Sequence, residues 1–342
     1  MNNVNYQTKP KILILFGGPS DEHDVSISSA KAISKEIDSD KFDVAYLYIT
    51  RDLKAKLFNI FSDEIFGTEI RTGFEQLLKV IKTYNLAFIG CLHGSFGEDG
   101  QIQKLFEMHN IAYNGSNSIS SQRCMNKFQS SRVILNSDIQ NSISNLKIPK
   151  SALCENIYEI EDFLQLANLS FPVVIKPNDS GSSVGVKICN NIRDVENYFQ
   201  NGLEKKILIE EFINGIELTC GVLETRESRF IKLPPVEIRP KLGKFFNYNS
   251  KYKADGSDEL CPPVSILKEM SDEIANISAQ IHKKLNCKLY SRSDFILKNN
   301  KLYYLETNTL PGLTVTSLLP KEADVIGLPY KELISFLIEN SL

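Results

Sequence analysis

One segment places a lysine at the end of an apolar strand and follows it with a loop of small residues. The segment reads Lys176-Pro-Asn-Asp-Ser-Gly-Ser-Ser-Val-Gly185. Glycine lets the backbone approach a ligand closely, and consecutive free N–H groups form a nest that binds phosphate oxygens. The segment matches neither GxxxxGK[ST] nor GxGxxG, which excludes the two commonest nucleotide motifs. The loop indicates either a phosphate site or a plain glycine-rich hairpin tip.

Two further segments, 292–298 and 302–308, are predicted to pair as a hairpin, and its register decides which side chains share a face. A two-residue turn at Asn299-Asn300 would put Asp294 and Glu306 on opposite faces. A three-residue loop from Asn299 to Lys301 separates polar pairs from apolar ones, namely Asp294–Glu306 and Arg292–Asn308 from Phe295–Leu305 and Leu297–Tyr303. We predict the three-residue loop, because asparagine tolerates the left-handed position that it requires.

The polar face of this hairpin would gather Asp294, Glu306 and Asn308. Carboxylate and amide oxygens suit Mg²⁺, which also keeps water and phosphate ligands. Carboxylates opposite each other on adjacent strands repel unless a cation lies between them, so a metal site is favoured. The alternative is a surface hairpin in which Arg292 bridges the acids.

Three loops could complete a catalytic cleft. Pro311-Gly312 follows the metal strand directly, and its exposed N–H could stabilise an oxyanion beside Arg292, although an ordinary turn is the commoner meaning of this dipeptide. The loops 17–22 and 93–100 each follow an apolar strand. Ligands of open α/β sheets bind beyond the carboxyl ends of strands, so both loops are candidates.

The elements that must position these residues alternate in the first third of the chain. Strands are predicted at 11–16, 42–49 and 86–92, with helices after Gly18 and at 74–82, which is typical of an α/β layer with a parallel sheet. Further strands are predicted at 171–176 and 207–213, and a helix from Tyr330. The polar stretch from Arg239 to Pro263 shows neither the helical nor the strand spacing of apolar residues. Loops of this length are usually lids or disordered segments.

Composition excludes several functions. The chain has 342 residues and a formal net charge of −3, without a basic block that would indicate nucleic acid or a membrane surface. Seven cysteines stand singly, outside metal-ligand spacing, and indicate a reducing compartment. No secretory signal and no apolar run of membrane-spanning length is present, so we expect a cytoplasmic protein.

Together these motifs resemble the D-alanine–D-alanine ligases of the ATP-grasp superfamily, from about Lys11 to about Leu337. The resemblance implies an α/β fold, α+β in its ATP-binding part, with three domains: an N-terminal parallel-sheet domain (1–115), a central domain (116–206) and a C-terminal domain (207–342) with a lid at 239–263. ATP would lie between the central and C-terminal domains.

The resemblance also implies a role for each site residue. ATP would be bound by Lys127, Lys176, Gly181, Ser182, Ser183, Glu210, Glu211, Ile213, Glu217 and the lid residue Lys251. Two Mg²⁺ (or Mn²⁺) ions would be bound by Asp294, Glu306 and Asn308. Catalysis would involve Glu22, Ser182, Tyr252, Arg292 and Gly312, and the substrates would also contact His93, Ser317 and Leu318.

The implied reaction is the ATP-dependent ligation of two D-alanine molecules through an acyl phosphate, for peptidoglycan precursor synthesis, by an enzyme that in relatives is commonly a homodimer. Ligases that join D-alanine to D-lactate or D-serine are the nearest alternative, and Lys251-Tyr252 favours the dipeptide former. A non-catalytic ATP-binding regulator is the alternative of another class. The chain departs from the family at Asn126, Glu211 and Phe246, none of which removes a phosphate, metal or carboxylate group.

Overall fold

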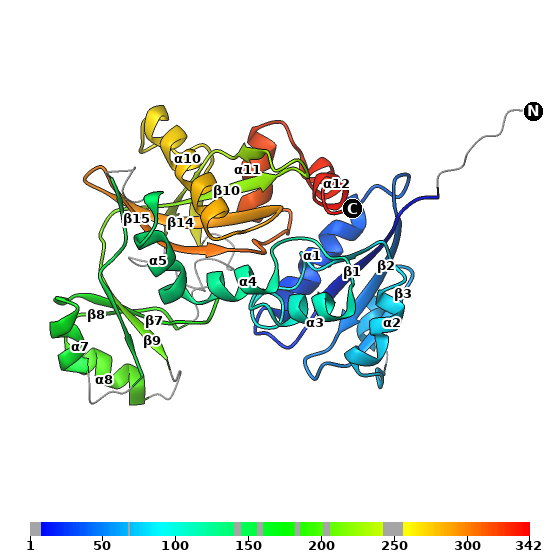
Figure 1. Ribbon diagram of the computed structural model, residues 1–342, viewed down its shortest axis with the longest axis horizontal. Coiled ribbons are helices and arrows are strands. Elements are labelled where there is room, and N and C mark those ends of the chain that lie inside the picture. Colours follow the sequence, from blue (N-terminus) through cyan, green and yellow to red (C-terminus); the bar gives the residue numbers. More distant parts are fainter. Residues whose placement is uncertain are drawn as a thin grey trace, which may run out of the picture.

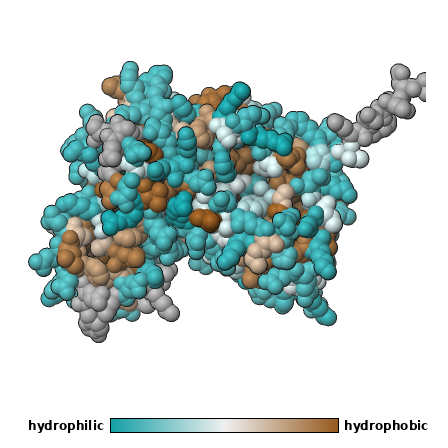
Figure 2. Space-filling model, viewed as in Figure 1, coloured by the Kyte–Doolittle hydropathy of each residue, from teal (hydrophilic) through white to brown (hydrophobic). Residues whose placement is uncertain are grey.

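The computed structural model describes residues 8–67, 69–139, 145–155, 160–181, 185–200, 206–241 and 256–342. Within these ranges the strands form three sheets, which lie in three lobes of the molecule (Figure 1). The face shown in Figure 2 is largely hydrophilic, with smaller apolar patches between the polar residues. In the described ranges no helix is long and apolar enough to cross a bilayer.

The N-terminal sheet has the strand order β3-β2-β1-β4. Strands β1 (Lys11–Gly17), β2 (Asp43–Ile49) and β4 (Leu86–Phe88) are parallel, as predicted, and β3 (Ala55–Phe58) adds an antiparallel edge. The predicted strand 86–92 is too long, because after Phe88 the Ile89 N–H donates to the Asn114 side chain (2.6 Å) instead of continuing the ladder. The predicted helix at 74–82 is a 3₁₀ turn, Phe74–Leu77, followed by α2 (Leu78–Ile81). Helices α1 (His23–Glu36) and α3 (Gln101–His109) follow the loops after β1 and β4.

The middle sheet is antiparallel, in the order β6 (Ser151–Cys154), β9 (Ile207–Glu211), β7 (Val173–Pro177), β8 (Lys187–Cys189). Buried residues of its strands pack with residues of α7 (Ile160–Leu166) and α8 (Ile192–Gln200). Helices α4 (Ser118–Met125) and α5 (Lys127–Leu135) connect the N-terminal lobe to this part of the chain (Figure 1).

The largest sheet has the order β13 (Ser257–Leu260), β12 (Val236–Pro240), β10 (Ile216–Glu224), β14 (Tyr290–Lys298), β15 (Lys301–Asn308), β5 (Leu146–Lys147), with β11 (Phe230–Lys232) beside β10. Helix α10 (Lys268–Lys284) packs on β10, β11 and β14. The polar stretch 239–263 therefore begins in the paired strand β12 and includes the paired strand β13 near its end, and residues 242–255 lie outside the described residues. The predicted domain boundaries at residues 115 and 206 stay predictions. Strand β9 begins just after residue 206 but pairs with β7 in the middle sheet, and β5 lies before residue 206 but pairs with β15 in the largest sheet.

The hairpin of β14 and β15 corrects our predicted register. The turn has two residues, Asn299 and Asn300, both with positive φ (49° and 56°), rather than three. Phe295 therefore pairs with Tyr304 and Leu297 with Leu302. A β-bulge at Leu305 then adds one residue to β15, which restores the predicted pairs Asp294–Glu306 and Arg292–Asn308. The polar face forms as expected, but by a bulge rather than by a longer loop.

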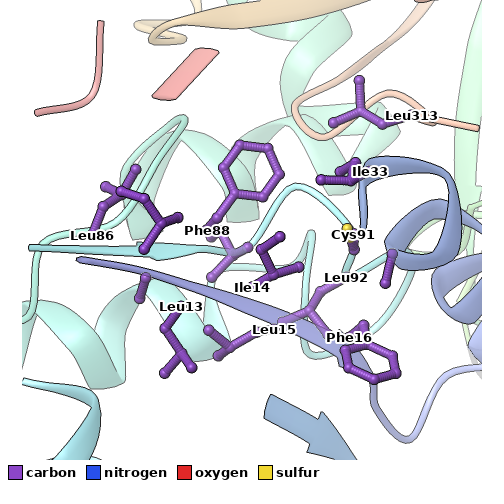
Figure 3. Packing of buried hydrophobic residues seen from close by; sticks show 14 of the residues in the cluster. Leu13, Ile14, Leu15, Phe16, Ile33, Leu86, Phe88, Cys91, Leu92 and Leu313 are labelled. Atoms are coloured by element: carbon purple, nitrogen blue, oxygen red, sulfur yellow. The ribbon is translucent and has the colours of Figure 1, made fainter. Parts of the chain in front are cut away.

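The N-terminal core includes residues from the other end of the chain. Figure 3 shows Leu313, which follows β15, beside Ile33 of α1 in a cluster built on β1 and β4. Buried residues of α11 (Leu318–Val325) and α12 (Tyr330–Glu339) belong to the same cluster. The loop after the proposed metal strand is thus held against the N-terminal sheet by apolar burial.

A buried polar network fixes α10 to the largest sheet. His282 of α10 lies with Nδ1 2.7 Å from Ser291 Oγ and with Nε2 3.4 Å from Glu224 Oε2, and Lys288 donates to Glu224 Oε1 (3.0 Å). Burial by itself would raise the pKa of Glu224, but the hydrogen bonds and charges of His282 and Lys288 outweigh it and lower the pKa from 4.5 to about 2. Ser291 lines neither of the two cavities of the candidate site described below, and the network joins α10 to β10 and β14.

We expect Glu224→Gln to destabilise the protein by about 1–3 kcal/mol at pH 6, because buried donors lose their charged acceptor. Since the folded-state pKa lies below the unfolded one, ionised Glu224 stabilises fully above about 4.5, and this contribution is lost as the pH falls from 4.5 to 2. Urea unfolding at pH 6 and pH 3.5 should show a smaller difference between wild type and variant at the lower pH. A difference independent of pH would contradict this, and the exposed Glu332→Gln is the control.

Candidate active site

A deep cavity lies between the middle sheet and the largest sheet. Its lining includes most of the residues that we expected to bind ATP, together with two expected metal ligands: Lys127, Lys176, Gly181, Glu210, Glu211, Ile213, Glu217, Asp294 and Glu306. Lys176 of β7 and Glu210 of β9 form a buried ion pair (2.7 Å) on the middle-sheet side. The other wall is the face of β10, β14 and β15.

Lys127 joins the two walls. It is the first residue of α5; its Nζ donates to the Ser180 carbonyl in the glycine-serine loop and lies 3.3 Å from Glu306 Oε2. Asn126 caps α5, since its side chain accepts from the Gln129 N–H (2.8 Å). Asparagine therefore performs the capping that an aspartate would perform, and this departure from the family leaves Lys127 well anchored.

The polar face of the largest sheet brings charges of both signs together. Thr219 of β10 pairs with Asp294, and its hydroxyl bonds to Asp294 Oδ1 and accepts from Arg292 Nε (2.9 Å). Burial by itself would lower the pKa of Arg292, but the charge and hydrogen bonds of Asp294 raise it, so the guanidinium stays charged. The face thus offers a fixed, buried positive charge beside a carboxylate.

The residues present fit a divalent cation. Asp294 pairs with Glu306 across the hairpin, and Asn308 Nδ2 lies 3.3 Å from Asp294 Oδ2, so three oxygen-bearing side chains converge. Two carboxylates and an amide leave room for phosphate and water ligands, which is the usual way Mg²⁺ binds beside a nucleotide. In the described residues no group of three or more His, Cys, Asp or Glu side chains offers a competing site.

A second cavity of about 450 Å³ adjoins the first. Arg292 and Leu318 line both cavities, so the two cavities meet at these residues. The remaining lining comes from the start of α1 and the loops after β1 and β4 at one end, and from the segment from Asn308 to Leu318 with Glu259 of β13 at the other.

The first end contains the two candidate residues Glu22 and His93, both buried. Ser20 Oγ donates to the His93 carbonyl (2.6 Å), and Ser29 Oγ lies 2.9 Å from His93 Nε2. Gly94 lies against this pair with a φ of 70°, and a Cβ at that position would stand 3.0 Å from Glu22 Oε2. Glycine is therefore needed where the two loops meet.

The second end is the N-terminus of α11. Ser317 is its N-cap residue, and Ser317 Oγ accepts from the Thr314 N–H (3.0 Å). The helix packs close to β10 because Gly221 has no side chain: a Cβ there would stand 2.4 Å from Glu322 Oε2. Ser317 and the Leu318 amide thereby reach the cavity, where a helix N-terminus favours a carboxylate.

Two family descriptions match this chain: "D-ala D-ala ligase N-terminus" over residues 11–116 and "D-ala D-ala ligase C-terminus" over residues 152–339. The chain is 32% identical over 335 residues to D-alanine–D-alanine ligase B of Clostridium perfringens, covering 97% of this chain and 98% of the relative. It is 35% identical over 354 residues to D-alanine–D-alanine ligase of Leptospira interrogans, with the same coverage of each chain.

The chain belongs to the D-alanine–D-alanine ligase family.

Solved structures agree with this membership. The D-alanine–D-alanine ligase of Bacillus anthracis complexed with ATP superposes with a TM-score of 0.74 at 28% identity, covering 97% of each chain. The VanG D-Ala:D-Ser ligase of Enterococcus faecalis superposes with a TM-score of 0.80 at 27% identity, covering 98% of this chain and all of the other. The predicted ATP-grasp fold of this ligase family is confirmed.

The structure brings most of the predicted ligase residues to one continuous site. Four of them, Ser182, Ser183, Lys251 and Tyr252, lie outside the described residues, as does Phe246. Gly181, next to the serines, lies close to the first end of the second cavity, since a Cβ there would stand 3.4 Å from Glu22 Oε2. The individual roles of these residues stay predictions.

Sequence reasoning missed Thr219 and Asn178. Asn178 is buried; its carbonyl accepts from the Lys127 N–H (3.1 Å) and its side chain from the Phe128 N–H (3.0 Å), so it fixes the start of α5. Strand alternation could have identified Thr219, because it shares a face with Glu217 two residues earlier. No local pattern could have identified Asn178, whose partners lie about fifty residues away.

Proposed function

We propose that this chain joins two molecules of D-alanine to D-alanyl-D-alanine, with conversion of ATP to ADP and phosphate, for peptidoglycan precursor synthesis. The observation that carries the proposal is the meeting of the two cavities at Arg292. A nucleotide in the first cavity would present its γ-phosphate to a carboxylate in the second.

The nucleotide cavity supports ATP as the phosphoryl donor. Lys127 and Lys176 supply positive charge for the phosphates, and Glu210, Ile213 and Glu217 line the same cavity, where they can receive the adenine and ribose. A family member from Bacillus anthracis has been solved with ATP. Phosphoryl transfer depends on positioning and charge neutralisation rather than on a protein nucleophile, which agrees with a cavity rich in lysine and carboxylate.

Two Mg²⁺ or Mn²⁺ ions are part of the proposal. Asp294, Glu306 and Asn308 would hold them, and the ions would supply neutralisation of the negative charge on the transferred phosphoryl group. Lys127, 3.3 Å from Glu306, would keep that carboxylate oriented towards the phosphates.

In the proposed mechanism the first D-alanine binds with its ammonium group at Glu22 beside His93. Its carboxylate attacks the γ-phosphorus of ATP, giving an acyl phosphate and ADP. The second D-alanine binds with its carboxylate at Ser317 and the Leu318 N–H. Its ammonium group gives up one proton to water, and the neutral amine attacks the acyl carbon. Arg292 and the Gly312 N–H stabilise the oxyanion, and phosphate then leaves and takes a second proton from the nitrogen, which gives the dipeptide.

We expect magnesium-dependent phosphate release from ATP when D-alanine is the only amino acid present, with D-alanyl-D-alanine as the product identified by mass. L-alanine should give no release above background, because Glu22 and the γ-phosphate fix the ammonium and the carboxylate of the first substrate, and the methyl groups of the two enantiomers then point in different directions. Binding of ATP without release in the presence of D-alanine would contradict the proposal and favour a non-catalytic regulator.

D-serine as the second substrate is the runner-up, because the VanG D-Ala:D-Ser ligase superposes over the full length of its chain. Competition between D-alanine and D-serine, resolved by product mass, separates the two. A cytoplasmic location also belongs to the proposal: all seven cysteines are free, as in a reducing compartment, and ATP is required. A homodimer stays a prediction, which sedimentation can test.

A further inference from the structure

The second cavity contains a carboxylate to which neither the sequence patterns nor the family resemblance gave a role. Glu259 lies on the edge strand β13 and lines the cavity together with Ser317 and Leu318. Its side chain is 18% exposed, and it forms an ion pair with Lys321 of α11. Since Lys321 is one helical turn beyond Ser317, Glu259 lies at the α11 end of the cavity.

The charges of the cavity are arranged to suit two zwitterions. Glu22 lies at the end formed by the N-terminal loops, and Glu259 lies at the opposite end, with Arg292 and the N-terminus of α11 as positive groups. Each amino acid carries one ammonium and one carboxylate. Glu22 accounts for the first ammonium and α11 for the second carboxylate, which leaves the second ammonium to be matched. Asp24 and Glu98 also line the cavity, but they lie with Glu22 on α1 and the loop after β4, so Glu259 is the carboxylate beside α11.

We propose that Glu259 binds the ammonium group of the second D-amino acid, and so selects an amino acid rather than a hydroxy acid as the acceptor. This inference rests on the proposed function and deepens it.

The ion pair with Lys321 prepares Glu259 for this role. Lys321 Nζ contacts Oε2, while within the described residues Oε1 makes no hydrogen bond. One oxygen is thus anchored to α11 and the other is available to a ligand. Because the side chain is mostly shielded from water, its charge acts on an ammonium more strongly than an exposed carboxylate would. Anchoring to α11 also keeps the ammonium site at a constant distance from Ser317, which receives the carboxylate of the same substrate.

The test is Glu259→Gln in the full chain, because glutamine keeps the size and can still accept a hydrogen bond from Lys321. Initial rates over a wide range of D-alanine concentrations give a separate KM for each of the two D-alanine sites. We expect the second-site KM to rise roughly ten- to a hundred-fold, as for loss of a charge-assisted hydrogen bond, and the first-site KM to change less than twofold. Lys321→Met is the matched control, which breaks the same ion pair but keeps the carboxylate. Its second-site KM should rise no more than about fivefold, the value of a partly exposed ion pair.

Equal effects of the two variants would overturn the proposal, because Glu259 would then only anchor β13 to α11. An unchanged second-site KM in Glu259→Gln would also overturn it, as would an equal rise at both sites. Failure of the proposed function is distinguishable, since wild type would then form no dipeptide at all. Unchanged thermal unfolding of both variants shows that they fold.

Discussion

Glu306→Gln should reduce magnesium-dependent phosphate release by more than roughly a hundred-fold, since even outer-shell partners of a metal contribute ten- to a hundred-fold. Glu306 faces Asp294 across the hairpin, and a neutral amide in its place removes one of only two carboxylates from the proposed metal site. The magnesium concentration for half-maximal rate should rise as well. Coupled phosphate release at increasing magnesium concentrations measures both effects.

The matched control for this variant is Glu339→Gln, because Glu339 also pairs with a lysine (2.9 Å to Lys41) but lies on the surface. Its activity should stay within twofold of wild type. Glu306 also contacts Lys127, so ATP affinity without magnesium must be measured. A loss of activity explained by weaker magnesium-free ATP binding would contradict a metal role for Glu306.

Arg292→Lys should lower kcat by roughly a hundred- to a thousand-fold, the loss typical of a removed oxyanion donor, with little change in ATP affinity. Arg292 already bonds to Thr219 and Asp294, and its planar guanidinium has further N–H groups for the cavity. A lysine ammonium keeps the charge but cannot bond to Thr219 and Asp294 and at the same time donate to an oxyanion in the cavity. Steady-state kinetics combined with calorimetric titration of a non-hydrolysable ATP analogue gives both quantities.

Arg239→Lys is the control for this substitution. Arg239 is also paired with a glutamate (2.6 Å to Glu237), but its side chain is 47% exposed and lines neither cavity. We expect a change of less than twofold in kcat. If Arg292→Lys instead weakened nucleotide binding at constant kcat, Arg292 would be a phosphate ligand rather than an oxyanion donor.

The hairpin shows how far the candidate site could be predicted from sequence. Polar residues at alternate positions correctly predicted that Asp294 faces Glu306 and that Arg292 faces Asn308. The same periodicity gave the wrong partners for Phe295 and Leu297, because a count of residues cannot reveal that Leu305 is accommodated as a bulge. The local pattern determined the face, and the geometry of the turn determined the register.

Strand lengths and supporting contacts were harder to predict. The apolar run 86–92 continues beyond the point where the strand ends, because a side chain from outside the strand, Asn114, captures the next N–H. The close approach of α11 to β10 depends on one glycine, Gly221, whose importance appears only when Glu322 lies against it. These contacts join residues 25 positions apart in the first case and 101 in the second, beyond the reach of a local pattern.

The N-terminal core has a consequence for biosynthesis. Leu313 and the buried residues of α11 and α12 complete a cluster most of whose other members lie before residue 112. At typical synthesis rates, roughly ten to forty seconds separate the emergence of these two parts from the ribosome. Throughout that interval the nascent N-terminal lobe carries uncovered apolar surface, which is the surface that chaperones bind. Helices α11 and α12 therefore complete the N-terminal core only after the whole chain is made, and a chain without them would leave part of this core exposed.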